Sequence, residues 1–299
     1  MDTMNYAIEY NNLESYGVVI NWRSEWVWSF LMVTCKKLGF SLHVFLTIIE
    51  AGYIFSVLWA VKRFVPSNPM LGMLFVFSSL MFFTFGVNGI RNGLACHLTL
   101  LAIAFLLDNR YFPGMVVALL AFGCHRSVFL PIIACMAGRF FVLDYKYAIY
   151  FWLLCIVISL SVGGVIANMF ASLGFDDRMT QYLTNRNNDT FSSTGFRWDF
   201  LLYSFPPVLL GWYVLVKRKI RDDWFRILCI TYTLCNAFWI LVIRVAFSNR
   251  FAYLSWFLYP IVIAYALINL PIWLDQDKKI GFILTCYCGF TIFMNTFVW

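Results

Sequence analysis

Apolar runs recur along most of the chain, and short polar segments separate them. A helix rises 1.5 Å per residue, so roughly 20 apolar residues cross the ~30 Å hydrocarbon layer of a bilayer. Barrel strands would instead alternate apolar and polar positions, whereas these runs are continuously apolar. The pattern predicts membrane-spanning helices over 41–60, 70–87, 90–107, 148–168, 199–216, 224–243, 251–270 and 280–298.

Composition supports the same class. Of the 299 residues, 62% are hydrophobic and 12% are charged, whereas about 25% of residues are charged in a typical soluble domain. The formal net charge is +7, and the chain has no arginine-rich arm suited to a nucleic acid. We expect an all-α, polytopic integral membrane bundle of about 9–10 membrane helices. It should form a single membrane domain over residues 1–299.

The segment 112–142 is too long for one straight span. Gly123 and the triplet His125-Arg126-Ser127 interrupt it, so we expect a broken hairpin of two short helices, about 112–124 and 127–142. The triplet would then lie at the tip of the hairpin.

Charge bias at the helix ends favours this hairpin. Lys62-Arg63 and the basic run 217–221 are the strongest positive clusters, and both should be cytoplasmic. Two short helices bring the number of crossings between these clusters to an even value, which returns the chain to the cytoplasm. A single helix leaves an odd number and would place the second cluster outside.

The same topology places several polar segments on the outer face. They are a polar and interfacial segment over 1–40 and a hydrophilic outer loop over 173–198, in addition to the hairpin tip. Residues 25–34 are apolar but too short to span, so we expect an interfacial helix with Trp22, Trp26 and Trp28 at headgroup level. An outer start without a signal sequence suggests that a first membrane helix precedes Met1, and a genuine N-out start is the alternative.

Cationic residues interrupt the apolar pattern at the outer ends of the predicted helices. Arg91 lies between Asn88 and Asn92 in the sequence, and His125-Arg126 lies at the hairpin tip. A charged group in a membrane segment costs ~2.5–3.5 kcal/mol even on insertion scales, so such groups usually face a polar cavity. A histidine can act as base or acid near neutral pH, and an arginine binds phosphate through a two-pronged fork. The alternatives are a snorkelling arginine and a plain polar turn.

Two later segments combine cations with aromatic and amide groups. Arg197, Trp198 and Asp199 place a cation, a stacking ring and a carboxylate where the 199–216 span begins. Arg244 and the pair Asn249-Arg250 lie between the next two spans. The alternatives are an aromatic belt with a local ion pair, and arginines that only anchor helix ends.

No metal site and no cofactor are expected. Asp275-Gln276-Asp277 has the D-x-D form that holds a divalent metal in many nucleotide-sugar transferases, but it lies in a short loop without an α/β domain around it. The nine cysteines mostly lie in apolar runs and include no C-x-x-C pair. We interpret His97 as a packing histidine and His43 as a boundary residue.

Four segments resemble the EpsG family of membrane proteins, which is grouped with Wzy-type polysaccharide polymerases. They are NGIRNGLA, GCHRSVFLP, STGFRWDFLLYS and FSNRFAYLSWFLYPI, and the likeness extends over nearly the whole chain. The opening DTMNY also resembles a segment that follows a first membrane helix in this family. Arg126 departs from the family pattern, where a small or apolar residue usually follows the histidine.

This resemblance implies assembly of exopolysaccharide, capsule or O-antigen at the outer face of a bacterial cytoplasmic membrane. The donor would be an oligosaccharide on polyprenyl pyrophosphate, and the acceptor a hydroxyl of another lipid-linked unit. Membrane lipids and other polysaccharide-assembly proteins would be its partners. Arginines can neutralise the departing pyrophosphate without a metal, and His125 or Asp199 could take the acceptor proton.

Two other classes remain as alternatives. A flippase or transporter of the lipid-linked oligosaccharide needs cations along a path through the bilayer, whereas here they gather at one face. A membrane acyltransferase that modifies the polysaccharide would use His125 as base but would not need a cluster of arginines.

Overall fold

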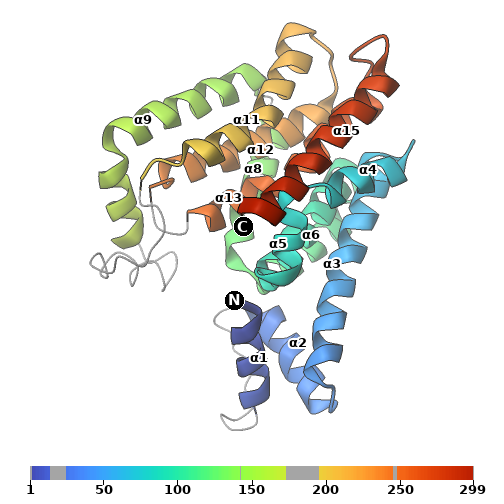
Figure 1. The fold of residues 1–299 in the computed structure, drawn as a ribbon, viewed down its shortest axis with the longest axis vertical. Coiled ribbons are helices and arrows are strands. Elements are labelled where there is room, and N and C mark those ends of the chain that lie inside the picture. Colours follow the sequence, from blue (N-terminus) through green and yellow to red (C-terminus); the bar gives the residue numbers. More distant parts are fainter. Residues whose placement is uncertain (1, 14–24, 142, 173–194, 245–247, 299) are drawn as a thin grey trace. The chain divides into compact units, whose positions relative to one another are not determined.

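The computed structural model describes residues 2–13, 25–141, 143–172, 195–244 and 248–298. This part of the chain is helical and contains no strand, which confirms the all-α prediction. The chain divides into two compact units, one of Met1–Ile133 with Pro260–Trp299 and one of Ala134–Tyr259. Figure 1 shows the helices of both units, and the single membrane domain over 1–299 stays a prediction.

The first unit holds most of the amino-terminal helices and the last helix of the chain. Its helices are α1 (Asp2–Asn12), α2 (Trp26–Lys37), α3 (Leu42–Phe64), α4 (Pro69–Phe77), α5 (Leu80–Val87), α6 (Ile90–Leu107), α7 (Tyr111–Cys124), the 3-10 turn η1 (Arg126–Val128), α15 (Gln276–Phe293) and the π-helical turn η3 (Met294–Val298). The helices α8 (Phe129–Phe140) and α14 (Tyr259–Asn269) connect the two units along the chain.

The second unit is built on α9 (Tyr145–Ser172), α11 (Trp198–Gly211), the π-helical turn η2 (Trp212–Lys217), α12 (Asp223–Leu241) and α13 (Asn249–Trp256). Polar side chains join these helices in the interior. Trp152 donates to the Asn236 side chain at 2.8 Å, and Trp256 donates to the Ser204 hydroxyl at 2.7 Å. Such bonds between helices satisfy polar groups that a hydrocarbon environment would leave without partners.

Seven helices among the described residues are long and apolar enough to cross a membrane. They are Leu42–Phe64, Ile90–Leu107, Tyr145–Ile166, Trp198–Lys217, Asp223–Leu241, Arg250–Asn269 and Gln276–Phe297, and each overlaps a predicted span. The prediction of a polytopic helical membrane protein is therefore confirmed.

The predicted span 70–87 is not one straight helix. It consists of α4 and α5, which bend by 71° at Ser78 and Ser79. Ser79 is extended, with φ −79° and ψ 139°, and serine is a residue type that favours helix ends over helix interiors. At this bend the Thr291 hydroxyl of α15 donates to the Ser78 carbonyl at 2.6 Å.

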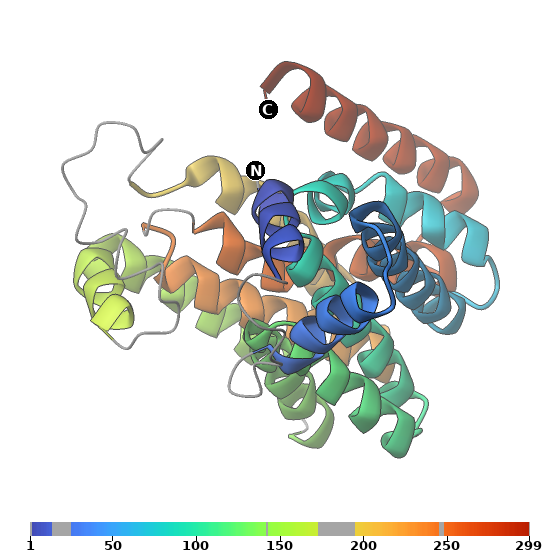
Figure 2. The same ribbon diagram turned by 90° about the horizontal axis from the view of Figure 1, so that it is seen from below.

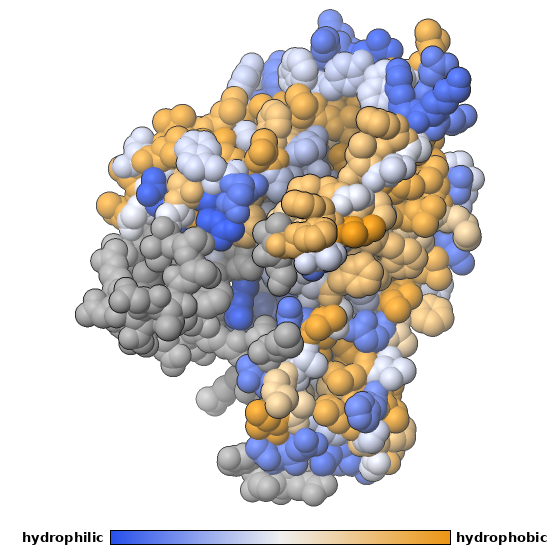
Figure 3. All heavy atoms as spheres, in the orientation of Figure 1, coloured by the Kyte–Doolittle hydropathy of each residue, from blue (hydrophilic) through white to orange (hydrophobic). Residues whose placement is uncertain are grey.

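The spans differ in how much of their surface the protein covers. Helices α6 and α12 are largely buried, whereas α9 and α15 expose most of their apolar side chains, among them Val157 and Phe282. In Figure 3 the surface over α15 is largely orange, the colour of hydrophobic residues. Exposed apolar helices of this length are unfavourable in water but suit the hydrocarbon of a bilayer.

The amino-terminal segment contains a helix that its polar sequence did not predict. Helix α1 lies beside α3 (Figures 1 and 2), and the hydroxyl of its buried Tyr10 donates to the Phe40 carbonyl at 2.8 Å. The short helix expected over 25–34 is present as α2, but Trp28 is buried and does not face outward. Its ring packs 5.0 Å from Tyr6 and 5.5 Å from Phe45, because α1 and α3 cover that face of α2. Trp28 therefore packs inside the protein, and its expected position at headgroup level stays a prediction.

The predicted break within 112–142 is confirmed, with one helix on each side of His125, and the hairpin arrangement of these two helices stays a prediction. Helix α7 ends at Cys124, His125 is extended with φ −154° and ψ 122°, and the chain re-enters a helix through η1 into α8. Helices α6 and α7 are antiparallel neighbours, since only the tight turn 108–110 joins them. At that turn Asp108 forms an ion pair with Arg63 of α3. The other end of the α6–α7 pair brings the start of α6 to His125.

Candidate functional site

The antiparallel packing of α6 and α7 brings Arg91 and His125 to the same end of the first unit. Arg91 is in the first turn of α6, and His125 follows the last residue of α7. The two helices have similar lengths, so the start of one lies near the end of the other. Arg91 and His125, both expected at helix ends, therefore lie in one region of the first unit.

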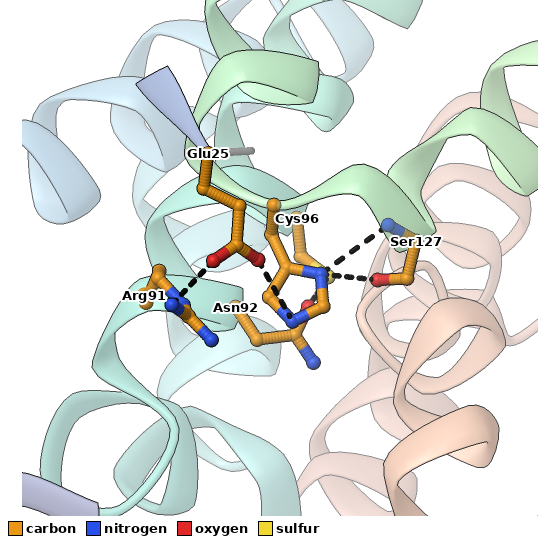
Figure 4. Close-up of polar contacts among 6 residues, drawn as sticks. Glu25, Arg91, Asn92, Cys96 and Ser127 are labelled. Atoms are coloured by element: carbon orange, nitrogen blue, oxygen red, sulfur yellow. Dashed lines mark hydrogen bonds and ion pairs between the residues drawn. The ribbon is translucent and has the colours of Figure 1, made fainter. Parts of the chain in front are cut away.

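A carboxylate that sequence reasoning missed lies between these two groups. Glu25, just before α2, forms an ion pair with Arg91 through the Nη1 atom of the arginine. Its other oxygen, Oε1, lies 3.8 Å from Nε2 of His125. In Figure 4 the Glu25 carboxylate points to Arg91 on one side and to the imidazole ring on the other. The three side chains are 19–27% exposed, so the cluster is only partly covered.

The opposite edge of the imidazole ring contacts Ser127. Nδ1 of His125 lies 2.7 Å from the Ser127 hydroxyl and 3.3 Å from the Ser127 backbone nitrogen. The backbone contact makes His125 the N-cap of η1, which satisfies an amide at the start of that turn. Figure 4 shows Ser127 on the side of the ring away from Glu25.

A glycine allows α2 to bring Glu25 to this place. A Cβ atom on Gly123 would lie 2.4 Å from the Val27 side chain and 2.8 Å from the Trp26 ring. Helix α2 therefore begins in direct contact with the last turn of α7, next to His125. Gly123 was expected to break the helix, but α7 continues through it, and its role is to permit this close approach.

Arg91 retains hydrogen-bonding capacity. Its guanidinium lies 5.6 Å from the Tyr6 ring centroid, which covers one face of the group. Its Nε atom is buried and has no hydrogen-bond partner among the described residues. Close by on α6, Cys96 contacts the Asn92 side chain at 3.4 Å. A guanidinium with one unused donor beside a shared carboxylate is suited to exchange that carboxylate for an anionic ligand.

Arg126 is exposed, on the first position of η1. His97 is buried, its Nδ1 lies 2.8 Å from the Gly93 carbonyl, and its ring packs 4.3 Å from Tyr53. These contacts are those of a packing histidine. The described residues include no group of three or more side chains that could hold a metal.

The second unit contains a separate cluster at the start of α11. Arg197 binds the Asp199 carboxylate in a two-pronged fork, with Nε–Oδ1 of 2.9 Å and Nη2–Oδ2 of 2.6 Å. The guanidinium also lies 3.8 Å from the Phe200 ring centroid. Trp198 is 60% exposed, and its ring lies 4.5 Å from that of Phe196. The Asp199 carboxylate thus already accepts two hydrogen bonds from its neighbour.

Arg244 lies against a kink in α9 of the same unit. Val162 leaves helical geometry there, with φ −126° and ψ 17°, and Nε of Arg244 donates to the Ser159 carbonyl at 3.1 Å. A Cβ atom on Gly163 would lie 2.9 Å from that Nε atom, so the glycine makes room for the arginine. The guanidinium also lies 5.9 Å from the Phe196 ring centroid.

Several expected site features lie at or beyond the edge of the described residues. Asn249 and Arg250 begin α13, and the side chain of Asn249 is outside the described part. The outer loop expected over 173–198 is outside it up to residue 194. The joint binding of one pyrophosphate by arginines of both units stays a prediction.

Two residues of the cluster in the first unit were not assigned a role from the sequence. Ser127 belongs to the His125-Arg126-Ser127 triplet. Its position two residues after His125 could have indicated that the two side chains are in contact. Glu25 is a carboxylate among the aromatic residues that open α2, and a charge at that position was a second signal.

Comparison with known proteins places these features in a family. The model of the EpsG family matches residues 1–299, the whole length of the chain. No curated protein and no solved structure gives a match. The family assignment agrees with the polytopic helical fold and with the sequence segments around Arg91 and His125. The chain belongs to the EpsG family.

Proposed function

We propose that this protein is a polysaccharide polymerase of the bacterial cytoplasmic membrane. It transfers a growing glycan from polyprenyl pyrophosphate to a hydroxyl of another lipid-linked repeat unit at the outer face. Family membership supports a membrane protein of the polysaccharide polymerase type. The observation that carries the proposal for this chain is the cluster in which Glu25 joins Arg91 to His125.

The reaction needs stabilisation of negative charge and removal of one proton. The bond between the anomeric carbon and the pyrophosphate oxygen breaks, and its electron pair leaves with the pyrophosphate. The acceptor oxygen attacks the opposite face of the carbon, so the configuration inverts. Arg91, with its unused Nε donor, is suited to bind the developing charge, and the exposed Arg126 directly follows His125 in the sequence.

His125 is the preferred base. The Glu25 carboxylate lies between the His125 ring and Arg91. Its negative charge stabilises the imidazolium that forms when the ring accepts a proton. Asp199, the other candidate base, is engaged in a fork with Arg197 and would have to leave it to act. Arg197, Arg244, Arg250, Trp198 and Asn249 are proposed to bind further parts of the lipid-linked substrates.

The decisive experiment uses purified protein and lipid-linked repeat units in detergent or vesicles. The wild type should lengthen the glycan without added nucleotide sugar, and the His125→Asn variant should not. Asparagine keeps a side-chain acceptor for the N-cap of η1 but is not a base at neutral pH. A folded wild-type protein that leaves the repeat units unextended would refute the proposal.

The same vesicles address the transport alternative. If lipid-linked units placed on one leaflet become accessible on the other without chain lengthening, the protein is a flippase. Chain lengthening on one leaflet without exchange supports the polymerase.

A further inference from the structure

The two ring nitrogens of His125 have different neighbours, and these neighbours fix the position of the ring proton. The Ser127 backbone N–H lies 3.3 Å from Nδ1, and an amide N–H can only donate. Nδ1 therefore presents its lone pair to Ser127. In the neutral ring the proton is then on Nε2, which faces Oε1 of Glu25 at 3.8 Å.

This tautomer decides which atom can act as the base. A neutral imidazole accepts a proton only at the nitrogen that lacks one, which here is Nδ1. The Ser127 hydroxyl lies on that same nitrogen at 2.7 Å, closer than the backbone amide. Because the hydroxyl occupies the basic edge of the ring, an acceptor hydroxyl cannot approach Nδ1 while Ser127 stays in place.

We propose that Ser127 is a catalytic residue that relays the acceptor proton to His125; this rests on the proposed polymerase function. The acceptor hydroxyl donates to Oγ of Ser127. As the acceptor oxygen forms its bond to the anomeric carbon, its proton moves to Oγ and the serine proton moves to Nδ1. Ser127 is neutral before and after the step, His125 becomes an imidazolium, and the pyrophosphate leaves with the electron pair of the broken bond.

Glu25 completes this arrangement on the far edge of the ring. The imidazolium carries a proton on each nitrogen, and its Nε2–H faces the Glu25 carboxylate. When an anionic donor binds Arg91, it competes with Glu25 for the guanidinium. Glu25 is then free to interact more closely with Nε2, so donor binding and proton acceptance favour each other.

A purely structural role for the His125–Ser127 contact makes a different prediction. The N-cap of η1 uses the backbone amide of Ser127, and the hydroxyl is not needed for it. Ser127→Ala therefore keeps the cap and removes only the relay. If the contact serves the turn alone, this substitution leaves catalysis unchanged.

The test measures glycan lengthening by Ser127→Ala, Ser127→Thr and His125→Asn in the purified full-length protein. Ser127→Ala should lower kcat ~100-fold with little change in KM, within the range of general acid–base catalysis. Ser127→Thr keeps a hydroxyl and should restore most of the rate. The solvent deuterium isotope effect of the wild type should depend on two transferred protons, and that of Ser127→Ala on one.

The outcomes separate the relay from the proposed function. Loss of activity in His125→Asn together with normal activity in Ser127→Ala overturns the relay and leaves His125 as the base. Normal activity in both variants overturns the proposed role of this cluster as a whole. If Ser127→Ala does not accumulate in the membrane, Ser127→Gly removes the same hydroxyl and takes its place.

Discussion

Two of the carboxylates that pair with arginines in this protein, Asp199 and Glu25, do so in opposite ways. Asp199 in the second unit binds Arg197, two residues before it, through both oxygens. Glu25 in the first unit binds Arg91 of α6 and lies next to His125 after α7. The first pair forms within one turn of chain, whereas the second depends on the packing of three helices.

This difference bears on function. A local fork uses two donors of the guanidinium and both oxygens of the carboxylate, so neither Asp199 nor Arg197 has its full capacity for a ligand. The Glu25 carboxylate is divided between two partners, and Arg91 keeps an Nε donor without a partner among the described residues. A carboxylate that is shared between two partners is easier to displace by a diphosphate. We therefore expect the catalytic step to depend on the Glu25 cluster and the Asp199 cluster to affect substrate binding.

The largest effect is expected from Arg91→Lys. Lysine keeps the charge but loses the planar fork and the Nε donor, so stabilisation of the pyrophosphate should fall and kcat should drop ~100-fold or more. Arg63→Lys is the matched control, because Arg63 also pairs with a carboxylate and lies over an aromatic ring. Equal activity of the two lysine variants would reduce Arg91 to a structural anchor.

Gly123→Ala should have the next largest effect. The new Cβ atom would lie 2.4 Å from Val27, so the start of α2 must move and take Glu25 away from His125. Overpacking of this kind costs ~1–3 kcal/mol of stability. We expect a lower melting temperature. If most of this free energy also raises the activation barrier, kcat should fall roughly 30-fold. Gly281→Ala on α15 is the control, since a Cβ atom there meets no atom within 4 Å.

Glu25→Gln should have a smaller effect. The amide keeps the size of the side chain but removes the charge that stabilises a His125 imidazolium, so kcat should fall about tenfold, which corresponds to ~1.4 kcal/mol. Initial rates of glycan lengthening at saturating donor measure this change. A rate that rises in Glu25→Gln would mean that the carboxylate mainly blocks Arg91 from the donor.

Asp199→Asn should have the smallest effect on catalysis. It releases Arg197 from the fork without removing a group of the Glu25 cluster, so kcat should stay within about threefold while KM changes. Steady-state rates over a range of acceptor concentrations separate the two parameters. A loss of kcat as large as that of His125→Asn would make Asp199 the base. The catalytic step would then depend on the Asp199 cluster and not on the Glu25 cluster.

Most of the fold was predictable from short segments of the sequence. Apolar runs of membrane length predicted the long helices, and a histidine, an arginine and a serine in a row between two short runs predicted the break after α7. The bend between α4 and α5 was missed, because two serines within an apolar run do not by themselves distinguish a bent span from a straight one.

The candidate site was predictable only in part, for a physical reason. Arg91 and His125 stand out singly, because each is an ionisable group in an apolar setting. Glu25 is also visible as a charge among aromatic residues, but its partners are not, because they depend on the contact of α2 with Gly123 of α7, which no periodicity in the chain indicates. A pair of residues two apart, such as Arg197 and Asp199, is visible in any window of the sequence.

The bend at Ser78 has a consequence for how the protein is made. Its carbonyl accepts the Thr291 hydroxyl of α15, which is synthesised 213 residues later. Helices α4 and α5 therefore leave the ribosome before the donor for this carbonyl exists, and the bend needs water or another polar group until α15 is made. Nascent chains arrested before Thr291 should be recognised more readily by membrane quality-control proteases than chains arrested a few residues after it.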